Sequence, residues 1–261
     1  ALQSTKGSGV IFNIESELSK KLLNLSREHG TTLFMTLLTA FKILLSRYSS
    51  GNDICVGTTV ANRSEKELEN LIGFFVNVLP LRSKVRPDQT FEELLEQVKS
   101  ITLEAFEQQE VPFEKIVEAT VKERDMSRSP LFQVMFILQN TPEVPDLRLG
   151  ETLLSPETSE INTSKFELTF SLTETENGLR GSVEYCTDLY KEETILRMIT
   201  HFKVLLNSIV KSPKEKTGRL NIIDEAEKHR LLIEFNDNAT EYPFDKTIVE
   251  LFEEQVSQYP D

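Results

Sequence analysis

The stretch LIGFFVNVLPLRS, residues 71–83, places a single carboxamide, that of Asn77, inside an almost unbroken apolar run. Such a run is typical of a strand buried within a sheet, which we expect over residues 74–79. Gly73 would allow a tight turn before this strand, and Pro80 would end its hydrogen-bond ladder. A buried amide without partners costs roughly 1–3 kcal/mol, so the sequence predicts that Asn77 hydrogen-bonds a neighbouring group.

The composition is that of a globular protein whose net negative charge disfavours binding to polyanions. The 261 residues are 39% hydrophobic, enough for one large domain or for a domain with extra segments. The 42 acidic and 29 basic residues give a net charge of −13, and no basic stripe appears. Because phosphate backbones and anionic lipids repel such a surface, we expect neither nucleic acid nor membrane as a partner.

The chain carries no secretion signal and no apolar run of 18 residues, so we expect it in the cytoplasm. Cys55 and Cys186 lie far apart in strand-like surroundings, without the clustered spacing that a zinc site needs. They are interpreted as buried free thiols, which suits a reducing compartment.

Strand and helix patterns mix along the chain. Residues 9–14 alternate like a strand, and helical spacing follows to Gly30. Residues 33–51 are apolar on most of a helical circumference, which predicts a central buried helix, and residues 53–61 predict a strand inside a sheet. Residues 166–188 predict a hairpin around Asn177-Gly178, and residues 192–210 a long helix.

Four further helix starts are indicated by capping pairs that precede amphipathic runs. The pairs are Ser64 with Glu67, Thr90 with Glu93, Asp224 with Glu227, and Thr247 with Glu250. The polar stretch KSPKEKTG, residues 211–218, predicts the end of the domain. The last helix has one apolar side with nothing to cover it, which we interpret as the beginning of another domain.

Catalytic patterns are missing from this sequence. It contains no Gly-rich phosphate loop, no HExxH and no GxSxG motif. Its three histidines, His29, His201 and His229, are isolated, and a lone helical histidine is usually structural or solvated. We therefore expect no catalytic residue and no metal site in this chain.

Three stretches together resemble a known family. IGFFVNVLPLR (residues 72–82), QQEVPFE (108–114) and RDMSRSPL (124–131) resemble, in order and approximate spacing, the last three signature motifs of condensation domains of non-ribosomal peptide synthetases. The flanking stretches KFELTFSLTE, EYCTDLY and FNDNATEYP are also similar, so the resemblance covers essentially the whole chain.

The departures from the family pattern are mild within these motifs. Val78 stands where the family usually has Thr, Gln108 and Glu110 differ from its second motif, and Ser129 stands in place of Asn. The motif residues that remain are Gly73, Asn77, Arg82, Pro112, Phe113, Arg124, Asp125 and Arg128. The large departure is that the family's catalytic HHxxxDG motif does not occur in this sequence.

The resemblance implies an α/β fold of the chloramphenicol-acetyltransferase-like type, a two-layer sandwich whose mixed sheet is packed by helices. The family's domain has two such lobes, and residues 1–212 look like the second one only. Residues 213–240 look like the linker to a following adenylation domain. Residues 241–261 look like the first helix of that domain.

In the family, upstream and downstream carrier proteins present an acyl or peptidyl thioester and an aminoacyl thioester on phosphopantetheine arms, and the lobes form a tunnel in which an amide bond forms. The resemblance implies that this chain supplies tunnel wall and carrier-docking surface, binds no cofactor itself and is inactive alone. The alternative is a non-catalytic domain of the same fold that binds carriers or recruits a tailoring enzyme. Exposed apolar surface left by the missing N-terminal lobe could also cause self-association.

The resemblance also suggests roles for individual residues. The tunnel candidates are Phe74, Asn77, Val78 and Arg63. For Asn77, the alternative is that its amide ties down neighbouring backbone. Gly73 and Arg82 are taken as structural motif residues.

The other two motifs are expected to be scaffold. Arg124, Asp125 and Arg128 could form a buried charge network that holds the loop before the next strand, because arginine suits bidentate pairing. Pro112 predicts the start of a helix, with Phe113 packed inward.

Overall fold

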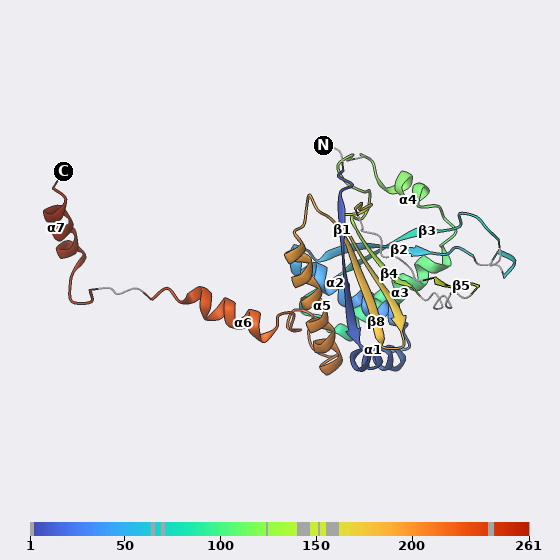
Figure 1. Cartoon of the computed structure of the whole chain (residues 1–261), viewed down its shortest axis with the longest axis horizontal. Helices are drawn as coiled ribbons and strands as arrows, with labels where there is room; N and C mark the ends of the chain where they lie inside the picture. Colours follow the sequence, from blue (N-terminus) through green and yellow to red (C-terminus); the bar gives the residue numbers. More distant parts are fainter. Residues whose placement is uncertain are drawn as a thin grey trace. The chain divides into compact units, whose positions relative to one another are not determined.

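The structure is a computed structural model that describes residues 3–63, 66–68, 71–123, 125–139, 147–150, 152–154, 162–239 and 243–260. It divides into two compact units, Ala1–Ile223 and Asp224–Asp261, which are described separately. Figure 1 shows the first unit as a sheet with helices packed along it. Among the described residues no single helix is long and apolar enough to cross a membrane, and α1 and α2 pass that test only as a pair bent by 105°.

A six-stranded mixed sheet forms the centre of the first unit, in the order β1-β8-β7-β4-β2-β3. Strand β4 runs parallel to both β2 and β7, and the other neighbours are antiparallel. The strands are β1 (Gly7–Glu15), β2 (Asp53–Val60), β3 (Asn77–Lys84), β4 (Val134–Gln139), β7 (Leu168–Thr175) and β8 (Gly178–Cys186). A separate short hairpin joins β5 (Leu147–Leu149) to β6 (Thr152–Leu154). The predicted α/β fold with a mixed sheet is confirmed.

Four helices cover one face of this sheet and enclose the core. They are α1 (Ser16–Glu28), α2 (Leu33–Ser49), α3 (Phe91–Glu107) and α5 (Glu192–Lys211). The prediction of a central buried helix is confirmed, because α2 is buried from Leu33 to Leu44 on nearly every side. Its Phe41 contacts three rings, those of Phe136, Phe170 and Phe202, with ring centroids 4.7–6.2 Å apart.

The β7–β8 hairpin forms where the sequence predicts it, with a small shift. Its turn residues are Glu176 and Asn177, and Gly178 already begins β8 with a φ of +119°. A side chain at Gly178 would also overlap the carbonyl of Ile14 on β1. Only glycine meets both conditions, the backbone angle and the close approach of a neighbouring strand.

Two details of the predicted strand over residues 74–79 are wrong. The strand begins only at Asn77, and the residues before it are irregular and largely exposed. Pro80 does not end the ladder, because β3 continues to Lys84 with Pro80 opposite Gly57. As β3 lies at the edge of the sheet, a proline without an N–H group is tolerated there.

The compact unit also extends beyond the predicted boundary at residue 212. Thr217 and Leu220 are buried, and backbone hydrogen bonds join Thr217 to Gln89 and Gly218 to Pro87. The polar composition of residues 211–218 suggested a linker, but their backbone groups are paired with the segment before α3. The unit therefore ends at Ile223.

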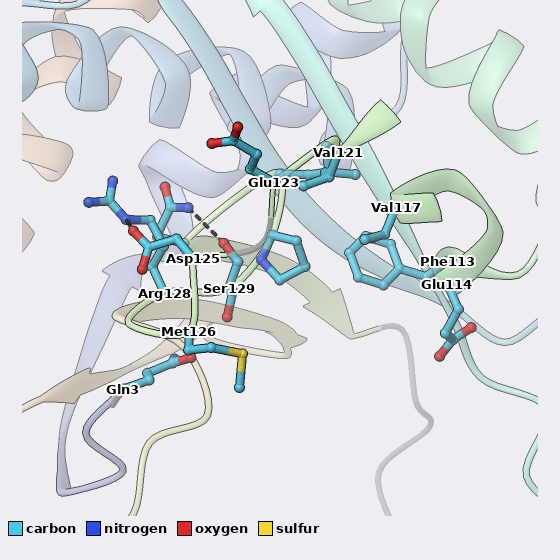
Figure 2. Close-up of a pocket in the computed structure, with 13 residues that line it drawn as sticks. Gln3, Phe113, Glu114, Val117, Val121, Glu123, Asp125, Met126, Arg128 and Ser129 are labelled. Carbon is cyan, nitrogen blue, oxygen red and sulfur yellow. Dashed lines mark hydrogen bonds and ion pairs between the residues drawn. The ribbon is translucent and has the colours of Figure 1, made fainter. Parts of the chain in front are cut away.

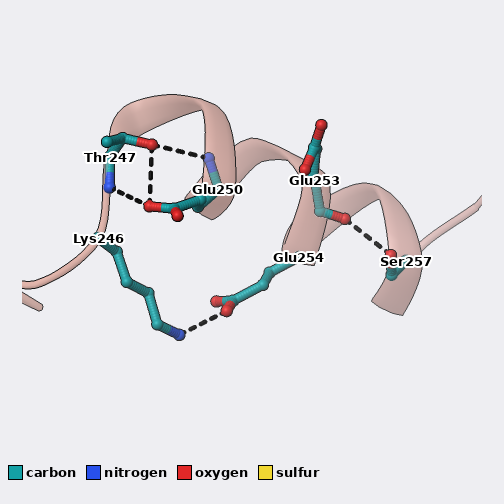
Figure 3. A network of polar contacts seen from close by, with 6 residues as sticks. All are labelled: Lys246, Thr247, Glu250, Glu253, Glu254 and Ser257. Atoms are coloured by element: carbon teal, nitrogen blue, oxygen red, sulfur yellow. Dashed lines mark hydrogen bonds and ion pairs between the residues drawn. The ribbon is translucent and has the colours of Figure 1, made fainter.

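The second unit contains α6 (Glu225–Leu232), the short 3-10 helix η2 (Glu234–Asn236) and α7 (Ile248–Gln258). Figure 3 shows the start of α7, where the hydroxyl of Thr247 accepts the N–H of Glu250 and the Glu250 carboxylate accepts the N–H of Thr247. The hydrogen bonds that the Glu250 carboxylate accepts from the N–H and the hydroxyl of Thr247 hold its pKa below its usual value. Four apolar residues of α7 are exposed, and Leu251 is half-buried: the exposed ones are Ile248, Val249, Phe252 and Val256.

Three of the four capping pairs predicted from the sequence lie at observed helix starts. Thr90 with Glu93 and Thr247 with Glu250 form complete capping boxes, and Asp224 accepts the N–H of Glu227. The start predicted at Ser64 lies outside the described residues, and a 3-10 helix, η1 (Lys66–Leu68), follows it.

One cation lies within the core. Lys42 of α2 has no exposed side-chain surface, and its Nζ donates to the carbonyl of Leu81 (2.9 Å) and to the hydroxyl of Ser83 (2.6 Å). Burial lowers the pKa of Lys42 to about 8, because desolvation disfavours the charged form. Nothing in the helical pattern of residues 33–49 marks this lysine as buried.

We predict that Lys42 makes stability depend on pH. Between about pH 8 and 10.5 the unfolded chain keeps this proton while the folded protein loses it, so the contribution of Lys42 to stability rises with pH. Relative to Lys42→Met, the free energy of unfolding of the unchanged protein should increase by about 2 to 3 kcal/mol from pH 7 to pH 10. Urea unfolding of both proteins measures this difference, and parallel pH curves would contradict the prediction.

Candidate functional site

The side chain of Asn77 joins two of the motif stretches. It lies at the start of β3 and is 9% exposed. Its Nδ2 donates to the carbonyls of Gln109 and Val111, both at 2.7 Å, and its Oδ1 accepts the N–H of Phe113 at 3.2 Å. Both amide hydrogens of Asn77 are thus donated to carbonyls of the turn before α4 (Phe113–Thr120). The side chain therefore holds neighbouring backbone in place, which is the alternative considered for Asn77 from the sequence. The sequence could not name these partners, since they are backbone groups more than 30 residues away.

The residues that precede Asn77 form an exposed apolar segment. Ile72 is 105% exposed and Phe74 is 94% exposed, and Leu71 and Val76 are about half exposed. A Cβ on Gly73 would lie 2.8 Å from the ring of Phe75, so this glycine allows that ring to fold back. Phe74 is therefore available to a partner surface rather than buried in a strand.

Arg63 and Val78 lie close to this segment. The guanidinium of Arg63 stacks on the ring of Phe75, 4.3 Å from its centroid, and donates to the carbonyl of Leu68. Arg63 also lines a cavity of about 300 Å³ together with Phe106 and other residues after β2. Val78 is half-buried in β3 opposite Thr59.

Arg82 forms a surface ion pair. Its Nε and Nη2 donate to the two carboxylate oxygens of Asp53 at 2.8 and 2.6 Å across the β2–β3 edge. The hydrogen bond from Arg82 holds the pKa of Asp53 below its usual value. Both partners contact solvent, so the pair orients the edge strands without burying charge.

The second motif continues into a small aromatic cluster on the other face of the sheet. Pro112 is the N-cap of α4, and Phe113 packs on Phe132 with centroids 5.5 Å apart, as the sequence predicts for an inward-facing residue. Phe132 in turn stacks on Phe166 and lies against Gly57 of β2, where a side chain would overlap its ring.

The prediction of a buried charge network in the third motif is wrong for the two members that the structure describes. Asp125 and Arg128 pair at 3.0 Å, but their side chains are 53% and 61% exposed. Hydrogen bonds from the hydroxyl and N–H of Ser127 lower the pKa of Asp125, with a smaller effect from Arg128. Arg124 lies outside the described residues.

A cavity of about 590 Å³ lies between the second and third motifs (Figure 2). Its apolar wall is formed by α4, by the residue that follows α4 and by the loop before β4: Phe113, Val117, Val121, Met126, Pro130 and Leu131. The carboxylates of Glu114 and Glu123 stand at different sides of it in Figure 2. Gln3, Ser129, Gln133 and the ion pair of Asp125 with Arg128 complete the lining, and the side-chain amides of the two glutamines donate to backbone carbonyls.

No group of three or more His, Cys, Asp or Glu side chains in the described ranges could hold a metal ion. His201 is buried in α5 with Nδ1 2.8 Å from the hydroxyl of Tyr48, and His29 lies 3.7 Å from Glu92. None of the histidines lines the cavities described above.

We predict that Asn77→Ala loosens the turn before α4. The change leaves two carbonyls and the N–H of Phe113 without their partner, and should lower the free energy of unfolding by about 1–3 kcal/mol. The N–H of Phe113 should exchange with solvent at least tenfold faster, which hydrogen exchange followed by NMR measures. Asn13→Ala, a change of an exposed asparagine on β1, is the control. Unchanged exchange at Phe113 would show that the tie is not needed.

Known proteins similar to this chain are parts of large synthetases. The family model described as "Condensation domain" matches residues 1–232. The chain is 41% identical to bacitracin synthase 3 of Bacillus licheniformis, over 100% of this chain and 4% of the synthase. It is 40% identical to gramicidin S synthase 2 of Brevibacillus brevis, over 100% of this chain and 6% of that protein. The chain thus spans a small fraction of these relatives.

Two solved structures share the fold. A four-domain nonribosomal peptide synthetase bound to AMP and glycine superposes with a TM-score of 0.84, at 24% identity, over 99% of this chain and 21% of that one. The X-domain from teicoplanin biosynthesis superposes with a TM-score of 0.78, at 26% identity, over 85% of this chain and 51% of that one. Together with the family match over most of its length, these similarities show that the chain belongs to the condensation-domain family of non-ribosomal peptide synthetases.

Proposed function

We propose that this chain is the second lobe of a condensation domain and supplies one wall of the tunnel in which an amide bond forms. In this proposal an acyl or peptidyl thioester and an aminoacyl thioester arrive on phosphopantetheine arms of two carrier proteins. The acceptor amine attacks the thioester carbonyl, so the N–C bond forms and the C–S bond breaks. The donor arm leaves as a free thiol, which takes up the equivalent of the proton that the amine loses. The HHxxxDG motif is absent from this sequence, so the chain alone is inactive.

The observation that carries this proposal is the convergence of the three motifs. Asn77 of the first motif holds the turn of the second, and Phe113 of the second packs on Phe132, which directly follows the third. These contacts connect the three motif stretches, which supports a shared role in a single wall.

Within that wall, this chain would position substrates rather than transfer protons. Phe74 is exposed and can contact an incoming arm or the N-terminal lobe, while Arg63 is held by its stacking on Phe75. Asn77 acts through the turn that it holds, because its N–H groups are already donated. Fixing two reactants in this way converts their encounter into an effectively unimolecular step.

The second unit extends the proposal along the chain. We assign α6 and η2 to the linker and α7 to the start of an adenylation domain, whose remaining part would cover Phe252 and the other exposed apolar residues of α7. Without such partners, the apolar surfaces around Phe74 and on α7 would favour self-association of the isolated chain.

A second candidate function is recruitment without catalysis. It is favoured by the 27% identity to an X-domain solved in complex with OxyB, with a TM-score of 0.76 over 86% of this chain. In that case the same surface binds a partner protein, and no amide bond forms.

The test is reconstitution of a complete domain. This chain is co-expressed with a matching N-terminal lobe that carries HHxxxDG, and peptide transfer between two loaded carrier proteins is measured by mass spectrometry. We expect transfer only when both lobes are present, and a reduction of about tenfold or more with Asn77→Ala, because a small displacement of a positioning element has effects of this size.

Controls separate the outcomes. Asn13→Ala should leave transfer unchanged, and replacing the second histidine of HHxxxDG in the partner lobe should abolish it. Transfer by this chain alone would refute the proposal that the N-terminal lobe supplies the catalytic residues. A folded, assembled pair that transfers nothing but binds a tailoring enzyme would favour the recruitment function.

A further inference from the structure

We propose that the 590 Å³ cavity between α4 and the loop before β4 binds a small amphiphilic cation, an apolar group that carries an ammonium. This site goes beyond the proposed function, since nothing in amide formation requires it. Its volume lies within the range of cavities that hold small ligands, and such cavities are mostly apolar with a few charged groups.

The wall of the cavity is held firmly on two sides. On the first side, the amide of Asn77 fixes the start of α4, which carries Phe113 and Val117. On the second side, the N–H of Phe132 donates to the carbonyl of Pro130 at 2.8 Å, which closes a tight turn around Leu131. The buried ring of Phe132, lying against Gly57, anchors that turn to the sheet.

Leu131 adopts an unfavourable backbone conformation in this turn. Its φ is +67°, which a bulky side chain rarely adopts and which belongs to the strained form of the γ-turn. Strain of this kind persists where the surroundings hold it, and it gathers at ligand sites. In this strained turn the Leu131 side chain lies in the wall of the cavity.

The charges around the cavity favour a cationic ligand. Arg128 is paired with Asp125, so these two charges offset each other. Glu114 and Glu123 line the cavity as well, and neither pairs with a cation in the part of the chain that the structure describes. Apart from that ion pair, the described lining offers a ligand mainly apolar surface, the polar groups of Gln3, Ser129 and Gln133, and two carboxylates. The ring of Phe113 can add attraction for a cation over its face.

The experiment uses three probes with one carbon skeleton: 4-phenylbutylammonium, 4-phenylbutan-1-ol and 4-phenylbutyrate. The chain has no tryptophan, so Met126→Trp places a single fluorescent reporter in the cavity wall. We expect saturable binding in the order ammonium, alcohol, carboxylate, with the ammonium preferred over the alcohol by about fivefold, as for a partly exposed charge contact.

Two sets of variants in this background identify the site. Glu114→Gln with Glu123→Gln should remove the preference for the ammonium, while Glu28→Gln with Glu193→Gln, which changes net charge equally at exposed residues of α1 and α5 that do not line the cavity, should keep it. Leu131→Gly suits the positive φ and should melt no lower than its parent, yet weaken the ammonium and the alcohol alike by about fivefold because apolar wall is lost.

The proposal is overturned if no probe binds saturably, if the three probes bind equally, or if the preference survives removal of both cavity carboxylates. It is also overturned if binding disappears once the N-terminal lobe is assembled on the chain, because the cavity would then be part of the docking site for that lobe. Failure of amide transfer in the reconstituted domain would leave this binding result unaffected.

Discussion

The carboxamide of Asn77 links the two faces of this molecule. The side chain lies on the covered face at the start of β3, and its three hydrogen bonds reach the turn that introduces α4. Through Phe113 and Phe132 that turn is connected to the opposite face of the sheet at Gly57. A short polar side chain can do this because both amide hydrogens and the carbonyl oxygen have partners in one turn, so its burial leaves no donor unsatisfied.

The two faces of the sheet have different physical roles. One face holds the main core, where α2 is buried and its Phe41 touches rings from β4, β7 and α5. The other face carries a smaller cluster around Phe132, Phe166 and Val117. The smaller cluster does not fill the space between α4 and the loop before β4, and a cavity remains there. The face that holds the main core thus supports a face on which a cavity remains.

Local chemistry explains which predictions from the sequence succeeded. The hairpin at Asn177-Gly178, the capping boxes at Thr90 and Thr247, and the helix start at Pro112 depend on backbone angles and hydrogen bonds within a few residues. The buried helix α2 follows from apolar residues around its whole circumference. The family motifs likewise are read directly from residue order, and the match over residues 1–232 agrees with them.

The differences concern burial and the extent of the compact unit, which depend on distant partners. The apolar run around Asn77 was expected to form a buried strand from residue 74, but Ile72 and Phe74 have nothing packed over them in the described part of this chain. Asp125 and Arg128 looked like a buried pair and are exposed, and residues up to Ile223 belong to the compact unit through hydrogen bonds that their polar composition does not reveal. The sequence by itself determined the fold class, the family and the need of Asn77 for partners, because periodicity, turn chemistry and the cost of an unpaired amide are local. Only the tertiary structure decided which groups Asn77 binds, where Lys42 is buried and where a cavity remains, because these depend on residues brought together from distant parts of the chain.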